Sequence, residues 1–278
     1  MLHHFATSEA QLGMLALGLM IAGTAGGLIA GMLGVGGGIV IVPILYHVLA
    51  GLGFDDQLRM HLAAGTSLAT IIPTSISSLR AHAKRGNVDW SLLRKWVLPM
   101  IGGVALGTSL SGLISGSTLA FIFACVALPI AANMALGKDS WRLANELPKG
   151  LGGSAIAASI GWLSSMMGLG GGTLGVPIMS HCNYPIHRAV GTASAFGVII
   201  SIPATVGMAL AGWNAPGLPV GSLGYVSLLG FILIAPASVL MAPVGAQLAH
   251  KMDRKRLRTI FALFIAVTAL RMLWNAVS

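Results

Sequence analysis

The chain alternates between long apolar segments and short polar connections over its whole length. We distinguish ten apolar segments, at 12–33, 35–52, 60–79, 93–113, 117–136, 150–168, 170–187, 189–212, 220–242 and 257–275. Most of them approach the roughly 20 apolar residues that a helix needs to cross the hydrocarbon of a bilayer. The pattern therefore predicts an all-α integral membrane protein, with 8–10 membrane segments in one membrane domain, residues 1–278.

The two halves of the chain, residues 12–136 and 150–275, repeat the same motifs. The segment 27–47, GLIAGMLGVGGGIVIVPILYH, matches 161–181, GWLSSMMGLGGGTLGVPIMSH, at ten of 21 positions. Later, HLAAGT from His61 matches HRAVGT from His187, and residues 107–124 align without a gap on 245–262. We therefore predict a structure built from two repeats.

The second segment of each half combines a glycine cluster with an internal proline. Each glycine inside a helix costs about 1 kcal/mol and each proline about 3 kcal/mol relative to alanine, which predicts broken or re-entrant segments at 35–52 and 170–187. Open backbone amides at a new helix start suit an anion, although the glycines could instead serve close helix packing. The candidate substrate-binding glycines are Gly36, Gly37, Gly38, Gly170, Gly171 and Gly172, and Pro43 and Pro177 are expected to fix the break.

Charge is scarce and confined to a few places. The chain is 55% hydrophobic and 8% charged, whereas soluble domains carry about a quarter charged residues. Fourteen of the 16 Lys and Arg fall at 80–95, 138–149, 188 and 251–258. Basic clusters beside apolar spans mark cytoplasmic loops, so we predict that 80–95, 137–149 and 249–258 are cytoplasmic. The net charge of +9 does not indicate nucleic-acid binding, because no aromatic residues alternate with the basic ones.

This loop assignment fixes the relation between the halves. With the basic loops inside, the uncharged segment 213–219 and residues 114–116 fall outside, together with both chain ends. Each half must then contribute an odd number of crossings, or three crossings and a re-entrant hairpin. Either arrangement predicts that the two repeats are inverted relative to each other.

The polar residues within the apolar segments suggest the chemistry of the site. All seven carboxylates lie in loops or at segment ends, so the usual acidic relay for protons or sodium is missing and a site for an anion is favoured. Hydroxyl donors could flank the glycines, although helix capping or interhelical hydrogen bonding would explain them equally. These candidates are Thr66, Ser67, Thr192 and Ser194.

Four histidines occupy duplicated positions and could gate the path or carry protons, or could simply be interfacial. They are His47, His61, His181 and His187. No carboxylate or cysteine pairs with them at a metal-ligand spacing, and we expect neither a metal nor a cofactor. Cys125 and Cys182 are interpreted as small packing residues.

The duplicated glycine cluster with its proline, the A-x-G-T segment after it and the loop Arg85-Gly86-Asn87-Val88-Asp89-Trp90 resemble the sulfite exporter TauE/SafE family, over roughly residues 15–275. The resemblance implies a bacterial inner-membrane permease that exports small sulfur-containing anions, such as sulfite, sulfoacetate or other organosulfonates. The second repeat departs from the first at Ser164 and Ser165, which replace Ala30 and Gly31, so the halves are expected to contribute unequally.

We therefore expect a transporter that binds a small anionic substrate between its repeats, sits in a lipid bilayer, and exposes the site alternately to each side. A homodimer is compatible with the sequence. A passive anion channel, or a transporter of another small carboxylate or oxyanion, remains an alternative. An intramembrane serine protease, suggested by Gly65-Thr66-Ser67 and Gly107-Thr108-Ser109, has no Ser–His pair at an interpretable spacing, so no enzyme activity is expected.

Overall fold

A computed structural model describes residues 9–33, 37–136, 144–251 and 254–277, and these form ten helices with one very short hairpin. The first half contains α1 (Glu9–Leu33), α2 (Gly38–Gly51), α3 (Asp56–Lys84), α4 (Trp90–Ser111) and α5 (Gly116–Leu136). The second half contains α6 (Gly150–Met167), α7 (Gly171–His181), α8 (Ile186–Ala211), α9 (Leu228–Lys251) and α10 (Arg254–Val277). The antiparallel strands β1 (Ser222–Leu223) and β2 (Val226–Ser227) precede α9.

The apolar segments predicted these helices well, which confirms the all-α class. Nine of the ten segments begin within four residues of the observed helix. The prediction for 220–242 is wrong at its start, because α9 begins only at Leu228. Gly217, Gly221 and Gly224 have φ angles of 78°, 77° and 55°, so the chain before α9 turns instead of continuing a helix.

Four helices in the described part of the chain are long and apolar enough to cross a membrane, namely Asp56–Lys84, Gly116–Leu136, Ile186–Ala211 and Leu228–Gly245. The stretches Ala16–Gly31, Gly38–Gly51 and Phe261–Ala276 are apolar but shorter. At 1.5 Å per residue, α2 and α7 span only about 21 and 17 Å, which is less than the roughly 30 Å hydrocarbon core. The second helix of each half therefore does not cross by itself.

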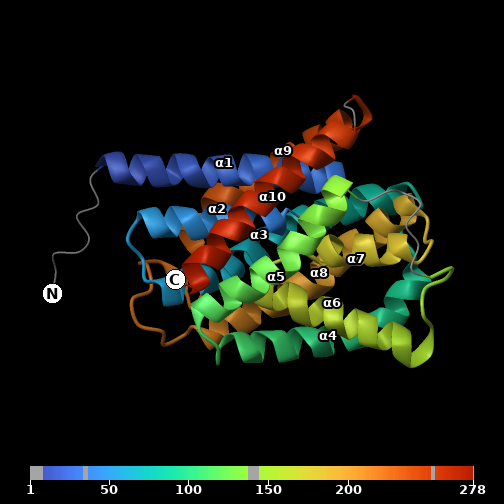
Figure 1. Ribbon diagram of the computed structural model, residues 1–278, viewed down its shortest axis with the longest axis horizontal. Helices are drawn as coiled ribbons and strands as arrows, with labels where there is room; N and C mark the ends of the chain where they lie inside the picture. Colours follow the sequence, from blue (N-terminus) through green and yellow to red (C-terminus); the bar gives the residue numbers. More distant parts are fainter. Residues whose placement is uncertain (1–8, 34–36, 137–143, 252–253, 278) are drawn as a thin grey trace.

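The helices run side by side along the long axis of the molecule (Figure 1). Helices α3 and α8 pack against each other at the centre, and α5 packs against α10. Helix α1 packs along α9, and α6 packs along α4. Each half therefore places its first helix against the fourth helix of the other half, so the two halves interlock.

The same close contacts recur at equivalent positions of the two halves, each at a glycine where an added Cβ would meet a carbonyl oxygen of the other half. These glycine–carbonyl pairs are Gly65 with Tyr225 and Gly191 with Asn87, Gly27 with Ser238 and Gly161 with Met100, and Gly245 with Leu28 and Gly107 with Trp162. Because only hydrogen fits at these glycines, the duplicated motifs preserve places where helices of different halves touch.

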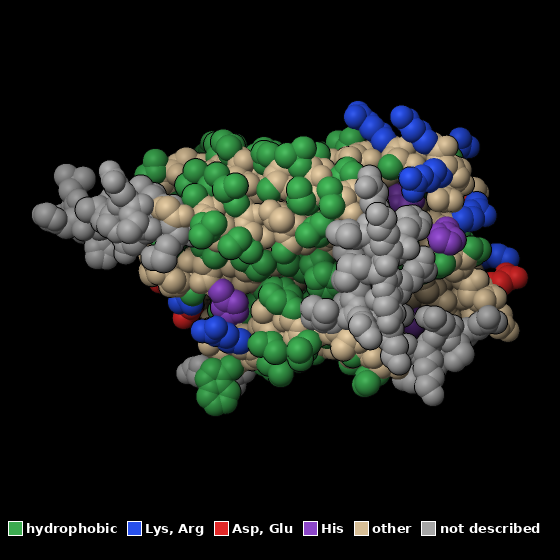
Figure 2. All heavy atoms as spheres, turned by 90° about the horizontal axis from the view of Figure 1, so that it is seen from above, with side chains coloured by type: hydrophobic (Ala, Val, Ile, Leu, Met, Phe, Trp, Pro, Cys, Tyr) green, Lys and Arg blue, Asp and Glu red, His purple; other side chains and the backbone are tan. Residues whose placement is uncertain are grey.

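The charged connections gather at one end of the molecule. The ends of α3, α5 and α9 and the starts of α4, α6 and α10 all lie at the end opposite the start of α1 and the end of α10 (Figure 1). Figure 2 shows most of the visible Lys and Arg at that basic end, with an apolar surface along the helices between the ends. This distribution is the one that a bilayer imposes.

Candidate functional site

The two glycine clusters meet at the centre of the molecule. A Cβ added to Gly38, at the start of α2, would lie 2.7 Å from the Gly168 carbonyl oxygen and 3.1 Å from the Leu169 Cα. The backbone of α2 therefore touches the backbone of the α6–α7 break directly. Gly37, the residue just before α2, has a φ of 74°, in the left-handed region. Gly36 lies outside the described residues.

The α6–α7 break is held by a hydroxyl from the first half. Gly168 ends α6 with a φ of 71°, and its carbonyl accepts a hydrogen bond of 2.7 Å from Ser67 Oγ on α3. Ser67 is fully buried. Ser67 is thus the one predicted hydroxyl that the structure brings to the glycine breaks through a direct hydrogen bond. Gly168 itself was not among the predicted binding glycines, although it belongs to the duplicated motif.

Both short helices begin inside the protein without a side-chain cap. The N-caps are Gly37 for α2 and Gly170 for α7, and neither position supplies a side-chain hydrogen bond. Gly37, Gly38 and the segment 170–172 are all buried. The first amides of a helix have no partner within the helix and carry partial positive charge, so a buried, uncapped start favours an anionic ligand.

The prolines do not form the breaks, which corrects the prediction for Pro43 and Pro177. Helices α2 and α7 run through them, and α7 is preceded by the non-helical glycines.

Two glycines within α7 leave room for the side chain of Phe196. A Cβ at Gly171 would lie 2.5 Å from the Phe196 Cβ, and a Cβ at Gly175 would lie 2.9 Å from the Phe196 ring. Phe196 is fully buried and stacks on Trp96.

Thr66 and Thr192 hydrogen-bond to backbone amides of the other half, whereas the sequence predicted that they flank the glycines as donors to an anion. The Thr66 hydroxyl accepts the Ser227 amide at 2.9 Å, and the Thr192 hydroxyl accepts the Asp89 amide at 3.0 Å. Each threonine thus holds the chain just before the fourth helix of the other half. Ser194 Oγ donates to the Gly191 carbonyl of its own helix. No contact in the described structure joins these three hydroxyls to the glycine breaks.

The interior contains buried hydroxyl groups but, among the described residues, no buried acidic side chain. Its buried hydroxyls include Thr70, Thr74, Ser75 and Ser201. Ser164 Oγ is buried and lacks a hydrogen-bond partner among the described residues, whereas Ser165 Oγ donates to the Trp162 carbonyl. Of the two serines that distinguish the second repeat, Ser164 therefore has a buried hydroxyl without a hydrogen-bond partner among the described residues.

The four candidate histidines occupy unlike environments. His181 Nε2 lies 3.0 Å from the Asn133 amide nitrogen, and the His47 ring meets the Tyr46 ring edge-on. His187 is exposed at the basic end. His61 is 4% exposed, with both ring nitrogens near backbone carbonyls. The duplication therefore does not give the two halves equivalent histidine sites.

A cluster around Asp89 joins the two halves at the basic end. The Asp89 carboxylate accepts the Leu92 amide, accepts the Tyr184 hydroxyl at 2.5 Å and lies 3.3 Å from the Arg188 guanidinium. Burial raises the pKa of Asp89, but the hydrogen bonds and Arg188 outweigh it and the pKa falls below its ordinary value. Burial and the neighbouring carboxylate raise the pKa of Tyr184 to about 12.

The sequence interpretation noted Asp89 only as part of a family motif and missed Tyr184. Tyr184 lies just before the second copy of the H-x-A-x-G-T motif, at 187–192, whereas Asp89 lies after α3 and far along the chain from both copies, so no sequence pattern linked the two. We call Asp89, Tyr184 and Arg188 the basic-end cluster.

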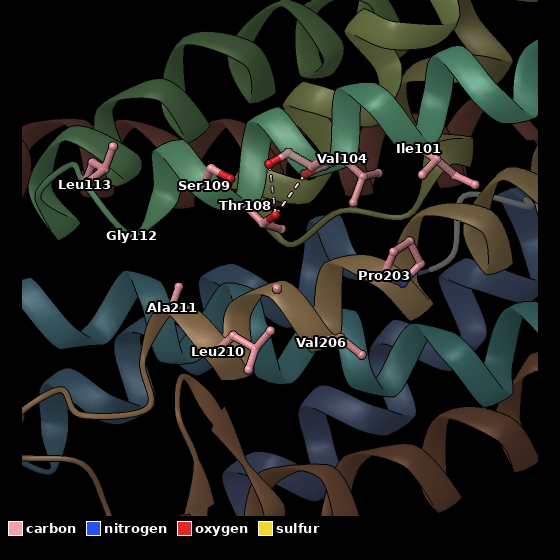
Figure 3. A pocket seen from close by; sticks show the side chains of 12 residues that line it. Ile101, Val104, Thr108, Ser109, Gly112, Leu113, Pro203, Val206, Leu210 and Ala211 are labelled. Carbon is pink, nitrogen blue, oxygen red and sulfur yellow. Dashed lines mark hydrogen bonds between the residues drawn. The ribbon is translucent and has the colours of Figure 1, made fainter.

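Two hollows lie away from the centre. A groove of about 530 Å³ between α4 and α8 is lined mainly by apolar side chains such as Ile101, Val206 and Leu210 (Figure 3). Its Thr108 hydroxyl donates to the Val104 carbonyl of its own helix, so the groove offers little to an anion. A second hollow of about 380 Å³, at the end opposite the basic loops, is lined by Asp55, Gln57, Leu58, His61, Ile114, Ala215, Pro216 and Tyr225.

The described helices and their apolar outer surface define a polytopic α-helical membrane protein. Within the described residues, no three His, Cys, Asp or Glu side chains come together as a metal site.

The sequence places this membrane protein in a known family. Residues 19–272 match the family described as sulfite exporter TauE/SafE. A probable membrane transporter protein of Haemophilus influenzae is 32% identical over 253 residues, covering 91% of this chain and 96% of its own. Probable membrane transporter proteins of Methanocaldococcus jannaschii and of Bacillus subtilis (YunE) are 26% and 27% identical, and cover 92% and 93% of this chain and 94% and 97% of their own.

The chain belongs to the sulfite exporter TauE/SafE family, as its duplicated motifs predicted. A multi-pass membrane transporter is therefore the class that fold and relatives define together.

Proposed function

We propose that the protein exports small sulfur-containing oxyanions, such as sulfite, sulfoacetate or other organosulfonates, across a bacterial inner membrane. One observation carries this proposal: two buried, uncapped helix starts lie close together in an interior where none of the described buried side chains is a carboxylate. An oxyanion there would receive backbone N–H groups of Gly37, Gly38 and the segment 170–172, with hydroxyls nearby. A cation would find no fixed negative charge.

The mechanism that we propose is alternating access between two inverted repeats. Helices along the chain alternate in direction, so each helix of the second half runs opposite to its counterpart (Figure 1). The recurrence of the glycine contacts supports the same relation. The basic end would face the cytoplasm and attract anions to the inner mouth. Movement of the helices across the α3–α8 contact would expose the glycine breaks to one side at a time.

Flux into proteoliposomes tests the proposal, with labelled sulfite, sulfoacetate, sulfate and acetate offered in turn. We expect saturable uptake and exchange of the sulfur oxyanions. Non-saturable flux would indicate a passive channel, preference for acetate would indicate a carboxylate transporter, and absence of flux for all four would contradict the proposal.

Ser67→Ala tests the site within the same assay. The change removes the hydrogen bond that positions the Gly168 carbonyl and adds no atoms. A net loss of about 1 kcal/mol predicts roughly fivefold weaker half-saturation. Thr268→Ala is the matched control, since its hydroxyl donates to the Phe264 carbonyl within α10. Equal half-saturation in the two variants would count against a site at the glycine breaks.

A further inference from the structure

His61 faces two hydrogen-bond acceptors at once. Its Nδ1 lies 2.7 Å from the Gln57 carbonyl oxygen, and its Nε2 lies 2.8 Å from the Ser111 carbonyl oxygen. A carbonyl oxygen can only accept, and a neutral imidazole has a single N–H. In a neutral ring, one nitrogen would direct its lone pair at an oxygen within hydrogen-bonding distance. Only a ring with two protons donates to both carbonyls.

We infer that His61 is a proton-binding site and that its ring holds two protons in this conformation. The inference deepens the proposed transport function by naming the proton as the coupling ion, and that coupling rests on the proposed function. The proton site itself rests only on the geometry of the ring.

The surroundings supply what a buried imidazolium needs. An isolated buried charge is costly, whereas hydrogen bonds donated by a charged group are about twice as strong as neutral ones. Ser111 is the last residue of α4, so its carbonyl belongs to the negative end of the helix dipole and lacks an intrahelical donor. The Tyr225 ring lies with its centroid 4.5 Å from the imidazole centroid and tilted by 30°, within the range of cation–π attraction.

The charged groups near the ring are few. At the start of α3 they are the N-cap residue Asp55 and, within the helix, Asp56 and Arg59, which form an ion pair. On the hairpin, Tyr225 is the titratable group in contact, and burial raises its pKa. The charged residues of α4, Arg94 and Lys95, lie at its other end, and α5 has none. Asp55 and His61 line the same hollow of about 380 Å³, so a carboxylate shares the hollow through which the ring would exchange its proton.

The position of His61 explains how its proton would affect transport. The ring ties α3 to the end of α4 in the first half and touches Tyr225 of the second half. Loss of one proton removes one of the two hydrogen bonds and the attraction of the Tyr225 ring. The contact between the halves at this end therefore depends on the proton. The equivalent residue, His187, is exposed at the basic end and provides an internal control.

Flux with an imposed pH gradient tests the coupling in full-length protein in proteoliposomes, with sulfite as the probe. If one proton moves with each sulfite, the sulfite concentrations on the two sides of the membrane can differ by up to about tenfold for each unit of pH difference. We expect gradient-driven accumulation in the native protein and in His187→Gln, and its loss in His61→Gln, which still exchanges sulfite. Gradient-driven accumulation retained in His61→Gln would overturn the coupling.

A spectroscopic measurement tests the proton site without any transport. In ¹⁵N-histidine-labelled protein in the buffer of the transport assay, a His61 ring that donates to both carbonyls should show two N–H signals that disappear in His61→Gln and persist in His187→Gln. A single N–H signal for His61 would overturn the inference. If the native protein moves no sulfur anion, the proposed function fails while this measurement still decides the proton site.

Discussion

Replacing Asp89 by Asn should loosen the basic end by a predictable amount. Asparagine keeps an oxygen that can cap the Leu92 amide, but it removes the charge that strengthens the 2.5 Å bond from Tyr184 and pairs with Arg188. Hydrogen bonds to a charged group contribute about 1.5–3 kcal/mol, against about 1 kcal/mol for neutral ones. The Arg188 side chain is 50% exposed, so the ion pair adds less than about 1 kcal/mol. We expect a loss of about 2 kcal/mol in the free energy of unfolding.

Thermal unfolding of the purified protein in detergent measures this loss. A change of about 2 kcal/mol corresponds to a fall of about 4–8 °C in Tm for a chain of this size. Glu146→Gln is the matched control, because the Glu146–Lys149 pair has side chains 75% and 86% exposed and should change Tm by no more than about 1 °C.

The dependence on pH sharpens the test. The pKa of Asp89 is lower in the folded protein than its ordinary value of 3.8, so its contribution is fully present above that value and is lost as the pH falls through the folded pKa. The Tm difference between Asp89→Asn and the native protein should therefore be constant at neutral pH and shrink in strong acid. Equal Tm values for Asp89→Asn and Glu146→Gln at neutral pH would refute the reasoning.

Two further changes test other contacts. Gly65→Ala should destabilise the protein by about 1–3 kcal/mol, because the new Cβ would overlap the Tyr225 carbonyl, whereas Gly102→Ala meets nothing within 4 Å and should be neutral or stabilising in the same unfolding assay. Tyr184→Phe removes a hydrogen bond that lowers the pKa of Asp89, so the acid limb of the stability curve should move to higher pH, and an unchanged limb would contradict the assigned cause.

The sequence predicted the helices because a bilayer imposes strong composition rules on a membrane-spanning chain. Apolar length predicted nine of the ten helix starts to within four residues. The predicted start of α9 was wrong because Gly217, Gly221 and Gly224 turn the chain where the apolar pattern predicted the beginning of a helix. The meeting of Gly38 with Gly168 was not predictable, since it joins residues far apart in the chain through a shape visible only after packing.

The hydroxyl residues show where sequence reasoning about the site stops. Ser67 and Thr66 are neighbours on one helix and equally plausible as donors to an anion. Because α3 turns about 100° per residue, Ser67 points to the Gly168 carbonyl and Thr66 points to the Ser227 amide. A repeated motif preserves the contact but does not reveal its partner, so Thr66 and Thr192 looked like site residues.

The pairing of α1 with α9 has a consequence for how the protein is made. At roughly 5–20 residues per second, the ribosome needs about 10–40 seconds to reach Leu228 after completing α1. During that interval the face of α1 that will carry Gly23 and Gly27 against α9 has only lipid, its own half or membrane chaperones to cover it. Neither half is therefore a self-contained folding unit, and two separately synthesised halves, divided between α5 and α6, should be stable only when they are produced together.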